Sequence, residues 1–244
     1  MSVLLFAAFF IWYFSSPEKK SIILDPEAEQ RQMKATPAAL SNFVPPTIIV
    51  LSDSENTLPR RNWSTQALEI NAEAALAMRA DGGRVYYNKN IETRRPVASL
   101  TKLMTAIIVL ENYNLEEIIK VSAAAVRREG SRGELRPSEE ITARALLNMM
   151  LIDSSNDAAI ALADKNSVFV SLMNKKAKEL GLLNTHFTNP DGLDEDDNYS
   201  TAVDIAKIFS YLANNYPAVF DILKTENVIV YSADGKITHR LKNT

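Results

Sequence analysis

Hydrophobic residues recur at helical spacing in the segment that follows Pro96. One stripe carries Leu103, Met104, Ile107 and Ile108, and the other faces carry Ala106, Val109 and Leu110. A helix that is apolar nearly all round is typical of the interior of a domain. The pattern therefore predicts a deeply buried helix that begins near Ser99.

Two further helices and two hairpins are predicted by similar patterns. Residues 143–151 and 158–163 are apolar at helical spacing, and the polar segment 153–157 joins them as a loop. Short strand-like runs flank two turn sequences, with strands expected at 74–78 and 84–87 around Asp81-Gly82-Gly83, and at 227–231 and 236–241 around Asp234-Gly235. The chain is thus expected to combine helices with antiparallel strands.

The first 64 residues differ in kind from the rest. Residues 3–14 are uninterruptedly apolar, and twelve residues make a helix of about 18 Å against roughly 30 Å of bilayer hydrocarbon. We expect residues 1–16 to be a signal peptide or a membrane anchor. Residues 17–64 hold six of the ten prolines and no glycine, which predicts a semi-extended linker. The folded domain is expected at residues 65–244.

Composition narrows the chemistry. Hydrophobic residues make up 46% and charged residues 23%, as in an ordinary globular protein, and a net charge of -3 gives no reason to expect nucleic-acid binding. The absence of cysteine excludes disulfides and thiolate sites. His186 and His239 are far apart, so packing or surface roles are favoured over a metal site. The acidic group at residues 191–197 lacks EF-hand spacing and is interpreted as a solvated loop.

The candidate chemistry begins at Ser99 and Lys102, three residues apart. Positions i and i+3 are neighbours on one helical face. Burial penalises a charged ammonium, which lowers the pKa of a lysine and favours the neutral, proton-accepting amine. A serine hydroxyl becomes a useful nucleophile when such a base removes its proton. Ser99 is therefore the candidate nucleophile and Lys102 the candidate base.

Ser154 and Asn156 lie in the polar segment between the next two predicted helices. Serine and asparagine are ordinary loop and cap residues, so either one alone indicates little. Their combination with Ser99 and Lys102 is more informative, because S-x-x-K followed by S-x-N is a known pairing in penicillin-recognising enzymes.

The run from Arg94 to Ala106 resembles the first motif of serine D-alanyl-D-alanine carboxypeptidases, the low-molecular-mass penicillin-binding proteins, and the run from Ser154 to Ala158 resembles the second. Further likeness follows in order at Asn184 to Phe187, Asn189 to Leu193 and Tyr199 to Ala202, so the resemblance covers about residues 68–244. It implies a penicillin-binding/β-lactamase-like transpeptidase fold of the α+β class, with an antiparallel sheet, a helical cluster and the active serine between them.

The resemblance also implies roles for the four residues. Ser99 would attack the carbonyl of the penultimate D-alanine of a peptidoglycan stem peptide, and Lys102 would take its proton. Ser154 would relay a proton to the leaving D-alanine, while Asn156 would hold the lysine and bind the substrate amide. β-lactam antibiotics would inhibit by acylating the same serine. No cofactor or metal is expected, and the site is expected in the cell envelope, with the N-terminal segment at the membrane.

A third motif, Lys-Thr-Gly or a close variant, is expected on a strand that follows the second hairpin. No such triplet occurs in the 244 residues, so we expect the C-terminal strands of the fold to follow Thr244. We expect the 244 residues by themselves to be inactive. Endopeptidase or transpeptidase activity on cross-links and a non-catalytic wall-binding module remain alternatives. A class A β-lactamase is disfavoured, because residues 179–184 contain one residue more than its E-x-x-L-N motif.

Overall fold

A computed structural model describes most of the chain from Glu69 onward. The described residues are Ser64 and residues 69–79, 84–131, 133–193 and 195–243. The predicted targeting segment at 1–16 and nearly all of the predicted linker at 17–64 lie outside them. The chain divides into the units Met1–Asn71 and Ala72–Thr244, and the second unit is described here.

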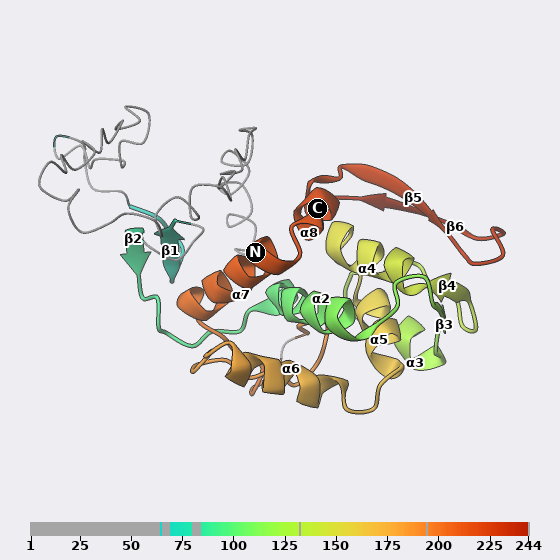
Figure 1. The fold of residues 1–244 in the computed structure, drawn as a ribbon, viewed down its shortest axis with the longest axis horizontal. Coiled ribbons are helices and arrows are strands. Elements are labelled where there is room, and N and C mark those ends of the chain that lie inside the picture. Colours follow the sequence, from blue (N-terminus) through green and yellow to red (C-terminus); the bar gives the residue numbers. More distant parts are fainter. Residues whose placement is uncertain (1–63, 65–68, 80–83, 132, 194, 244) are drawn as a thin grey trace, which may run out of the picture. The chain divides into compact units, whose positions relative to one another are not determined.

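This unit consists of helices and short strands, with five consecutive helices from α4 to α8 (Figure 1). In chain order the elements are β1 (Ala75–Met78), β2 (Val85–Lys89), a 3₁₀ turn (Ala98–Leu100), α2 (Thr101–Asn112), β3 (Ile118–Lys120), α3 (Ala123–Val126), β4 (Glu140–Thr142), α4 (Ala143–Ile152), α5 (Asn156–Asp164), α6 (Phe169–Glu179), α7 (Ala202–Asn215), α8 (Ala218–Lys224), β5 (Asn227–Tyr231) and β6 (Thr238–Lys242). This composition confirms the α+β class predicted from the sequence.

Helix α2 is the centre of the helical cluster. Every residue from Thr101 to Val109 is buried, and the helix contacts α4, α5, α6 and α7 (Figure 1). The predicted buried helix is thus confirmed, but it begins at Thr101, and Ser99 lies in the 3₁₀ turn before it. Ala98, the first residue of that turn, has a φ of 45° in the left-handed region, so a right-handed α-helix cannot extend back through it.

The described strands pair antiparallel in three two-stranded sheets, β1 with β2, β3 with β4 and β5 with β6. The hairpin β5–β6 packs on α4, and along β6 the buried residues His239 and Leu241 alternate with exposed ones. The predicted strand at 227–231 is confirmed. Its partner begins at Thr238 instead of 236, because the hydroxyl of Ser232 accepts the backbone N–H of Ile237 and so extends the turn.

The other predicted elements shift by one to three residues. In the first hairpin β1 begins at Ala75 and β2 extends to Lys89, while the turn at 81–83 lies outside the described residues. Helix α5 begins at Asn156 instead of residue 158, because Ser155 acts as its N-cap and accepts the backbone N–H of Ala158. The loop between α4 and α5 therefore shrinks to three residues.

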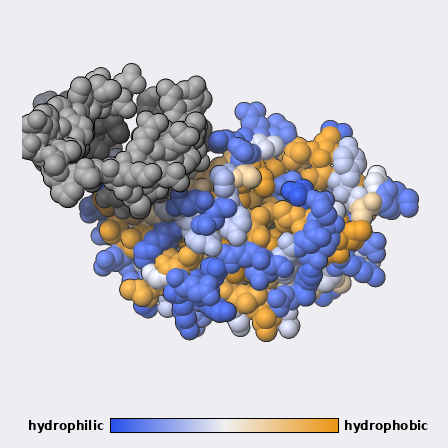
Figure 2. Space-filling view, in the orientation of Figure 1, coloured by the Kyte–Doolittle hydropathy of each residue, from blue (hydrophilic) through white to orange (hydrophobic). Residues whose placement is uncertain are grey.

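Exposed apolar side chains are spread over several elements. They are Val85, Tyr86, Ile118, Val168, Leu183, Ile229 and Tyr231. On the face drawn in Figure 2, hydrophobic and hydrophilic residues are interspersed over the described part of the molecule. Among the residues that the structure describes, none of the helices is both long enough and apolar enough to cross a bilayer.

Gly192 lies directly against the turn that carries Ser99. Its φ is +81°, and a Cβ atom at this position would come within 1.9 Å of the backbone oxygen of Ala98. The side-chain oxygen of Asn189 accepts the backbone N–H of Gly192 at 2.7 Å and holds the loop in place. Both the conformation and the close approach therefore require glycine here.

Replacing this glycine should destabilise the fold. We expect Gly192→Ala to lower the free energy of unfolding by about 3 kcal/mol, the sum of left-handed strain and overpacking. Gly181→Ala is the matched control, since Gly181 has a φ of +64° but no atom within 4 Å of its Cβ position; its loss should be about 1 kcal/mol. Urea denaturation of both variants measures the difference, and equal losses would contradict the steric argument.

Candidate active site

The four residues predicted as a site meet at the N-terminal end of α2. Ser99 lies in the 3₁₀ turn, Lys102 in the first turn of α2, Ser154 between α4 and α5, and Asn156 at the first position of α5. Hydrogen bonds join Lys102 to Asn156 over 54 positions and Ser154 to Ser99 over 55 positions. The structure thus brings all four together, although Ser99 and Lys102 do not share one α-helix.

Lys102 is the hub of the four. Its Nζ donates to Asn156 Oδ1 at 2.7 Å and to Ser99 Oγ at 3.1 Å, and it lies 3.4 Å from Ser154 Oγ. The residue is only 3% exposed. Such a buried amine is accommodated because each of its three donors has a polar neighbour.

The pKa of Lys102 is lowered from 10.5 to about 8. The largest cause is burial, which disfavours the charged form. The carboxylate of Asp191 raises the pKa, and the guanidinium of Arg128 lowers it. A substantial fraction of Lys102 is therefore a neutral base slightly above neutral pH.

Ser154 completes a triangle of side chains with Ser99 and Lys102. Its hydroxyl donates to Ser99 Oγ at 2.9 Å. The backbone of Ser154 has a φ of 56°, in the left-handed region. Ser99 directly follows Ala98, which is also left-handed. Ser99 is exposed while Lys102 is buried, so the hydroxyl of Ser99 faces solvent and the amine lies behind it.

Asn156 is fixed by the loop that follows α3. Its Nδ2 donates to the backbone oxygen of Glu129 at 2.7 Å, and its backbone N–H donates to Ser131 O at 2.8 Å. A Cβ at Gly130 would come within 2.5 Å of that Nδ2, so the loop passes very close to the amide. These contacts leave the amide oxygen directed at Lys102.

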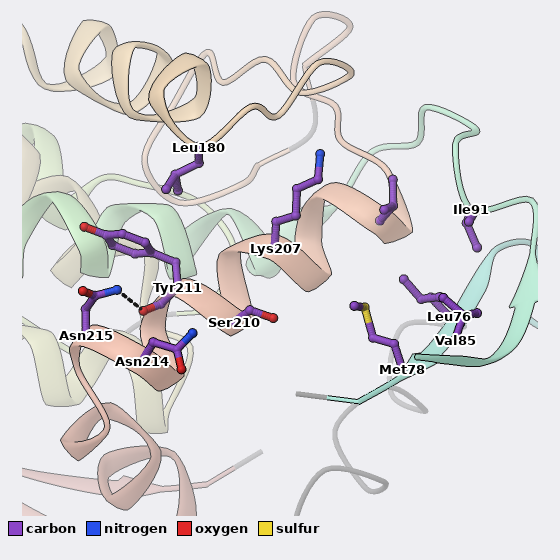
Figure 3. A pocket seen from close by; sticks show the side chains of 11 residues that line it. Leu76, Met78, Val85, Ile91, Leu180, Lys207, Ser210, Tyr211, Asn214 and Asn215 are labelled. Carbon is purple, nitrogen blue, oxygen red and sulfur yellow. Dashed lines mark hydrogen bonds between the residues drawn. The ribbon is translucent and has the colours of Figure 1, made fainter. Parts of the chain in front are cut away.

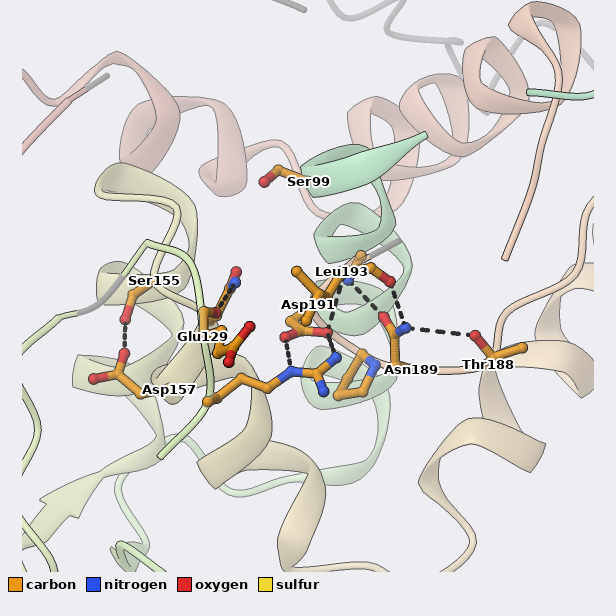
Figure 4. Close-up of polar contacts among 12 residues, drawn as sticks. Ser99, Glu129, Ser155, Asp157, Thr188, Asn189, Asp191 and Leu193 are labelled. Carbon is orange, nitrogen blue, oxygen red and sulfur yellow. Dashed lines mark hydrogen bonds and ion pairs between the residues drawn. The ribbon is translucent and has the colours of Figure 1, made fainter. Parts of the chain in front are cut away.

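Ser155 is turned away from the nucleophile, as Figure 4 shows. It is fully buried, and its hydroxyl donates to Asp157. The Asp157 carboxylate also accepts the backbone N–H groups of Gly133 at 2.9 Å and Leu135 at 3.1 Å. This role of Asp157 was not predicted from the sequence. The signal that could have indicated it is an acidic residue in the first turn of a helix.

The interpretation of residues 191–197 as a solvated loop is wrong for Asp191. Residues 195–197 are exposed and residue 194 lies outside the described residues, but Asp191 is 1% exposed. Its carboxylate accepts two hydrogen bonds from the guanidinium of Arg128, at 2.5 and 2.8 Å (Figure 4). The buried charge is stabilised by a partner 63 positions earlier, which no local pattern indicates.

Both histidines have structural contacts. Buried His239 lies with Nε2 2.7 Å from Glu139 Oε1 and Nδ1 2.9 Å from Gly133 O. His186 Nδ1 lies 2.8 Å from the backbone oxygen of Asp197. Among the described residues, no group of three or more histidine or acidic side chains has an arrangement that could hold a metal ion.

A separate hollow of about 490 Å³ lies between the β1–β2 hairpin and α7 (Figure 3). Its walls are mainly apolar, and its lining includes Leu76, Met78, Val85, Ile91 and Tyr211. None of the four site residues lines it. The hollow is therefore separate from the four candidate site residues.

The chain is similar in sequence to D-alanyl-D-alanine carboxypeptidases and endopeptidases. A family model described as D-alanyl-D-alanine carboxypeptidase matches residues 61–244. D-alanyl-D-alanine carboxypeptidase DacF of Bacillus subtilis is 40% identical over 151 residues, which cover 58% of this chain and 39% of that protein. D-alanyl-D-alanine endopeptidase of Escherichia coli is 32% identical over 182 residues, 72% of this chain and 58% of that protein.

Solved structures show the same fold. A mutant of the DD-transpeptidase of Streptomyces K15 matches with a TM-score of 0.67 and 34% identity, over 72% of this chain and 75% of that one. The D-alanyl-D-alanine carboxypeptidase DacD of Francisella tularensis matches with a TM-score of 0.64 and 32% identity, over 70% and 44%.

The chain spans only 39% and 58% of the length of the two curated relatives named above. The family match is nevertheless continuous from residue 61 to residue 244 and includes Ser99, Lys102, Ser154 and Asn156. The likeness seen in the sequence motifs therefore extends over the whole described unit, and the chain belongs to the D-alanyl-D-alanine carboxypeptidase family.

Proposed function

We propose that this protein is a serine-type D-alanyl-D-alanine carboxypeptidase, which removes the terminal D-alanine from peptidoglycan stem peptides through an acyl-enzyme on Ser99. The observation that carries the proposal is buried Lys102, whose Nζ lies 3.1 Å from Ser99 Oγ and whose pKa is lowered to about 8. An amine with this pKa is close to the optimum for a general base near neutral pH.

The hydrogen-bond inventory of the neutral amine gives each neighbour a role. The carbonyl oxygen of Asn156 can only accept, so it takes one N–H of Lys102. Ser154 takes the other N–H and donates its own proton to Ser99 Oγ, in agreement with the 2.9 Å contact. The remaining lone pair of Lys102 then faces the hydroxyl of Ser99. Asn156 is thereby a positioning residue that orients the base.

The acylation step follows from this arrangement. Lys102 takes the proton of Ser99 while Oγ attacks the carbonyl carbon of the penultimate D-alanine. The C–N bond breaks, the leaving amine of D-alanine takes a proton from Ser154, and Ser154 regains one from Lys102. The product is an ester on Ser99, which water hydrolyses. A positioned base of this kind contributes about 10² to 10⁴ in rate. A β-lactam would be opened by the same attack.

Endopeptidase activity is the second candidate. It is favoured by the 32% identity to the Escherichia coli endopeptidase over 182 residues. Both activities break an amide bond on the carboxyl side of a D-alanine, so Ser99, Lys102 and Ser154 would act alike. The difference lies in the leaving group, a free D-alanine or a cross-linked peptide.

We also propose that the protein acts in the cell envelope and is associated with the membrane through residues 1–16. The support is the location of peptidoglycan outside the cytoplasm and the apolar stretch at residues 3–14.

Product analysis tests the reaction and its nucleophile together. The protein expressed from its complete reading frame should release D-alanine from a stem pentapeptide and should be labelled covalently by a fluorescent penicillin. Ser99→Ala should abolish both, whereas Ser155→Ala should retain labelling because Ser155 faces Asp157. Cleavage of cross-linked dimers without release from the pentapeptide would favour the endopeptidase. A folded wild-type protein that shows neither reaction nor labelling would indicate a binding module.

The base should set the pH dependence of acylation. The reactive form is the neutral amine, so the rate should rise with pH through a midpoint near 8 and level off above it. Lys102→Arg should lower the acylation rate by at least about 100-fold, because a guanidinium stays protonated and cannot accept a proton. Stopped-flow acylation between pH 6 and 10 provides the measurement. A flat profile, or an active arginine variant, would assign the base to another group.

The location can be tested by protease accessibility in cells whose envelope is permeabilised but whose inner membrane is intact. The domain should be digested by added protease and should fractionate with membranes. Protection until the inner membrane is lysed would place it in the cytoplasm and contradict the proposal.

A further inference from the structure

The ion pair between Arg128 and Asp191 joins two loops that lie on different sides of the candidate site. Arg128 follows α3, and Asp191 lies in the loop between α6 and α7. The guanidinium makes a bidentate contact, with Nε 2.5 Å from Oδ2 and the second nitrogen 2.8 Å from Oδ1. The Asp191 side chain is fully buried and that of Arg128 is 24% exposed. Bidentate geometry fixes both distance and orientation.

The loop of Asp191 supports the nucleophile side of the site. The backbone oxygen of Pro190 accepts the hydroxyl of Thr105, one turn after Lys102 on α2, at 2.6 Å. Gly192 packs against the backbone oxygen of Ala98, the residue before Ser99. Any movement of this loop would therefore be transmitted to the turn that holds the serine.

The loop of Arg128 supports the opposite side. Glu129, the next residue, accepts Asn156 Nδ2 through its backbone oxygen at 2.7 Å. The side-chain oxygen of Asn156 in turn accepts a hydrogen bond from Nζ of Lys102. The dashed lines at Asp191 in Figure 4 mark its contacts with the guanidinium of Arg128, the residue before Glu129.

The same pair supplies the charges that face Lys102. Burial is the main cause of the lowered pKa of Lys102, the Asp191 carboxylate raises that pKa, and the Arg128 guanidinium lowers it. Glu129 and Glu195 face Arg128 and raise its own pKa, after the larger effect of the hydrogen bond to Asp191. The other close neighbours of the amine, Ser99, Ser154 and Asn156, are neutral.

We propose that Arg128 and Asp191 are positioning residues of the acylation reaction, which tie the nucleophile loop to the asparagine loop and balance the charge beside Lys102. This inference rests on the proposed function of the site. In this proposal neither residue touches substrate. The negative charge of Asp191 and the positive charge of Arg128 act on Lys102 in opposite directions. Removing Arg128 leaves the fully buried Asp191 carboxylate without its bidentate partner, and removing Asp191 leaves the Arg128 charge without its bidentate partner beside the base.

The two single variants should therefore shift the base in opposite directions. In Arg128→Gln the Asp191 anion is uncompensated, which raises the pKa of Lys102, so the midpoint of the acylation profile should move up by about one pH unit. In Asp191→Asn the Arg128 cation loses its bidentate partner, although Glu129 and Glu195 still face it, so the midpoint should move down. The double variant should return toward the wild-type midpoint. Arg128→Lys is the matched control, since it keeps the charge and should keep the midpoint.

The experiment measures the acylation rate with a fluorescent penicillin from pH 6 to 10, together with NMR titration of ¹³Cε-labelled lysine, in which Lys102→Arg identifies the resonance. Opposite shifts in the two single variants support the inference. Unchanged midpoints, or shifts in one direction only, overturn it, because a merely structural pair would lower the plateau rate without moving the midpoint. If Asp191→Asn does not fold, Arg128→Gln decides alone: an unmoved midpoint overturns the inference.

The two readouts separate this inference from the proposed function. A wild-type protein that is not acylated, but whose Lys102 resonance shifts oppositely in the two variants, would overturn the function and keep the charge balance. A wild-type protein that is acylated, with variants whose midpoints do not move, would keep the function and overturn the role of the pair.

Discussion

The candidate site is built around the burial of one amine. Lys102 is 3% exposed on the central helix α2, and its pKa is lowered from 10.5 to about 8. At 1.4 kcal/mol per unit, holding the protonated lysine disfavours the fold by about 3 kcal/mol relative to the unfolded chain. The penalty is present below pH 8 and disappears as the pH rises toward 10.5. The burial that creates the base thus opposes folding at neutral pH.

The polar groups around this amine are held by backbone that departs from regular structure. Ala98 and Ser154 both have left-handed φ values, which place the hydroxyls of Ser99 and Ser154 within 2.9 Å of each other. Each such residue costs about 1–2 kcal/mol. The close contact of Gly192 with Ala98 and the cap at the start of α5 keep the two turns in these conformations. Strain is concentrated where two hydroxyls must face one amine.

Periodicity and short motifs predicted three helices, two hairpins and the four residues of the candidate site, but not α3, α6, α7, α8 or the β3–β4 pair. Helices α2 and α4, the first strand of each hairpin and the meeting of Ser99 with Lys102 follow from patterns within a few residues. The pairing of Arg128 with Asp191 over 63 positions and of His239 with Glu139 over 100 positions could not be predicted, since each depends on the complete packing. The break at Ala98 was also hidden, because alanine favours a helix.

The contacts of His239 have a consequence for the order in which the chain folds. The histidine joins β6 to Gly133 and Glu139, and the backbone N–H of Gly133 donates to the Asp157 carboxylate in the first turn of α5. Contacts between residues 100 and 106 positions apart carry a large entropic cost of loop closure and form slowly. During synthesis from the N-terminus, helices α2, α4 and α5 have all left the ribosome before His239 exists. We therefore expect the contacts of His239 to be among the last of the described unit to form.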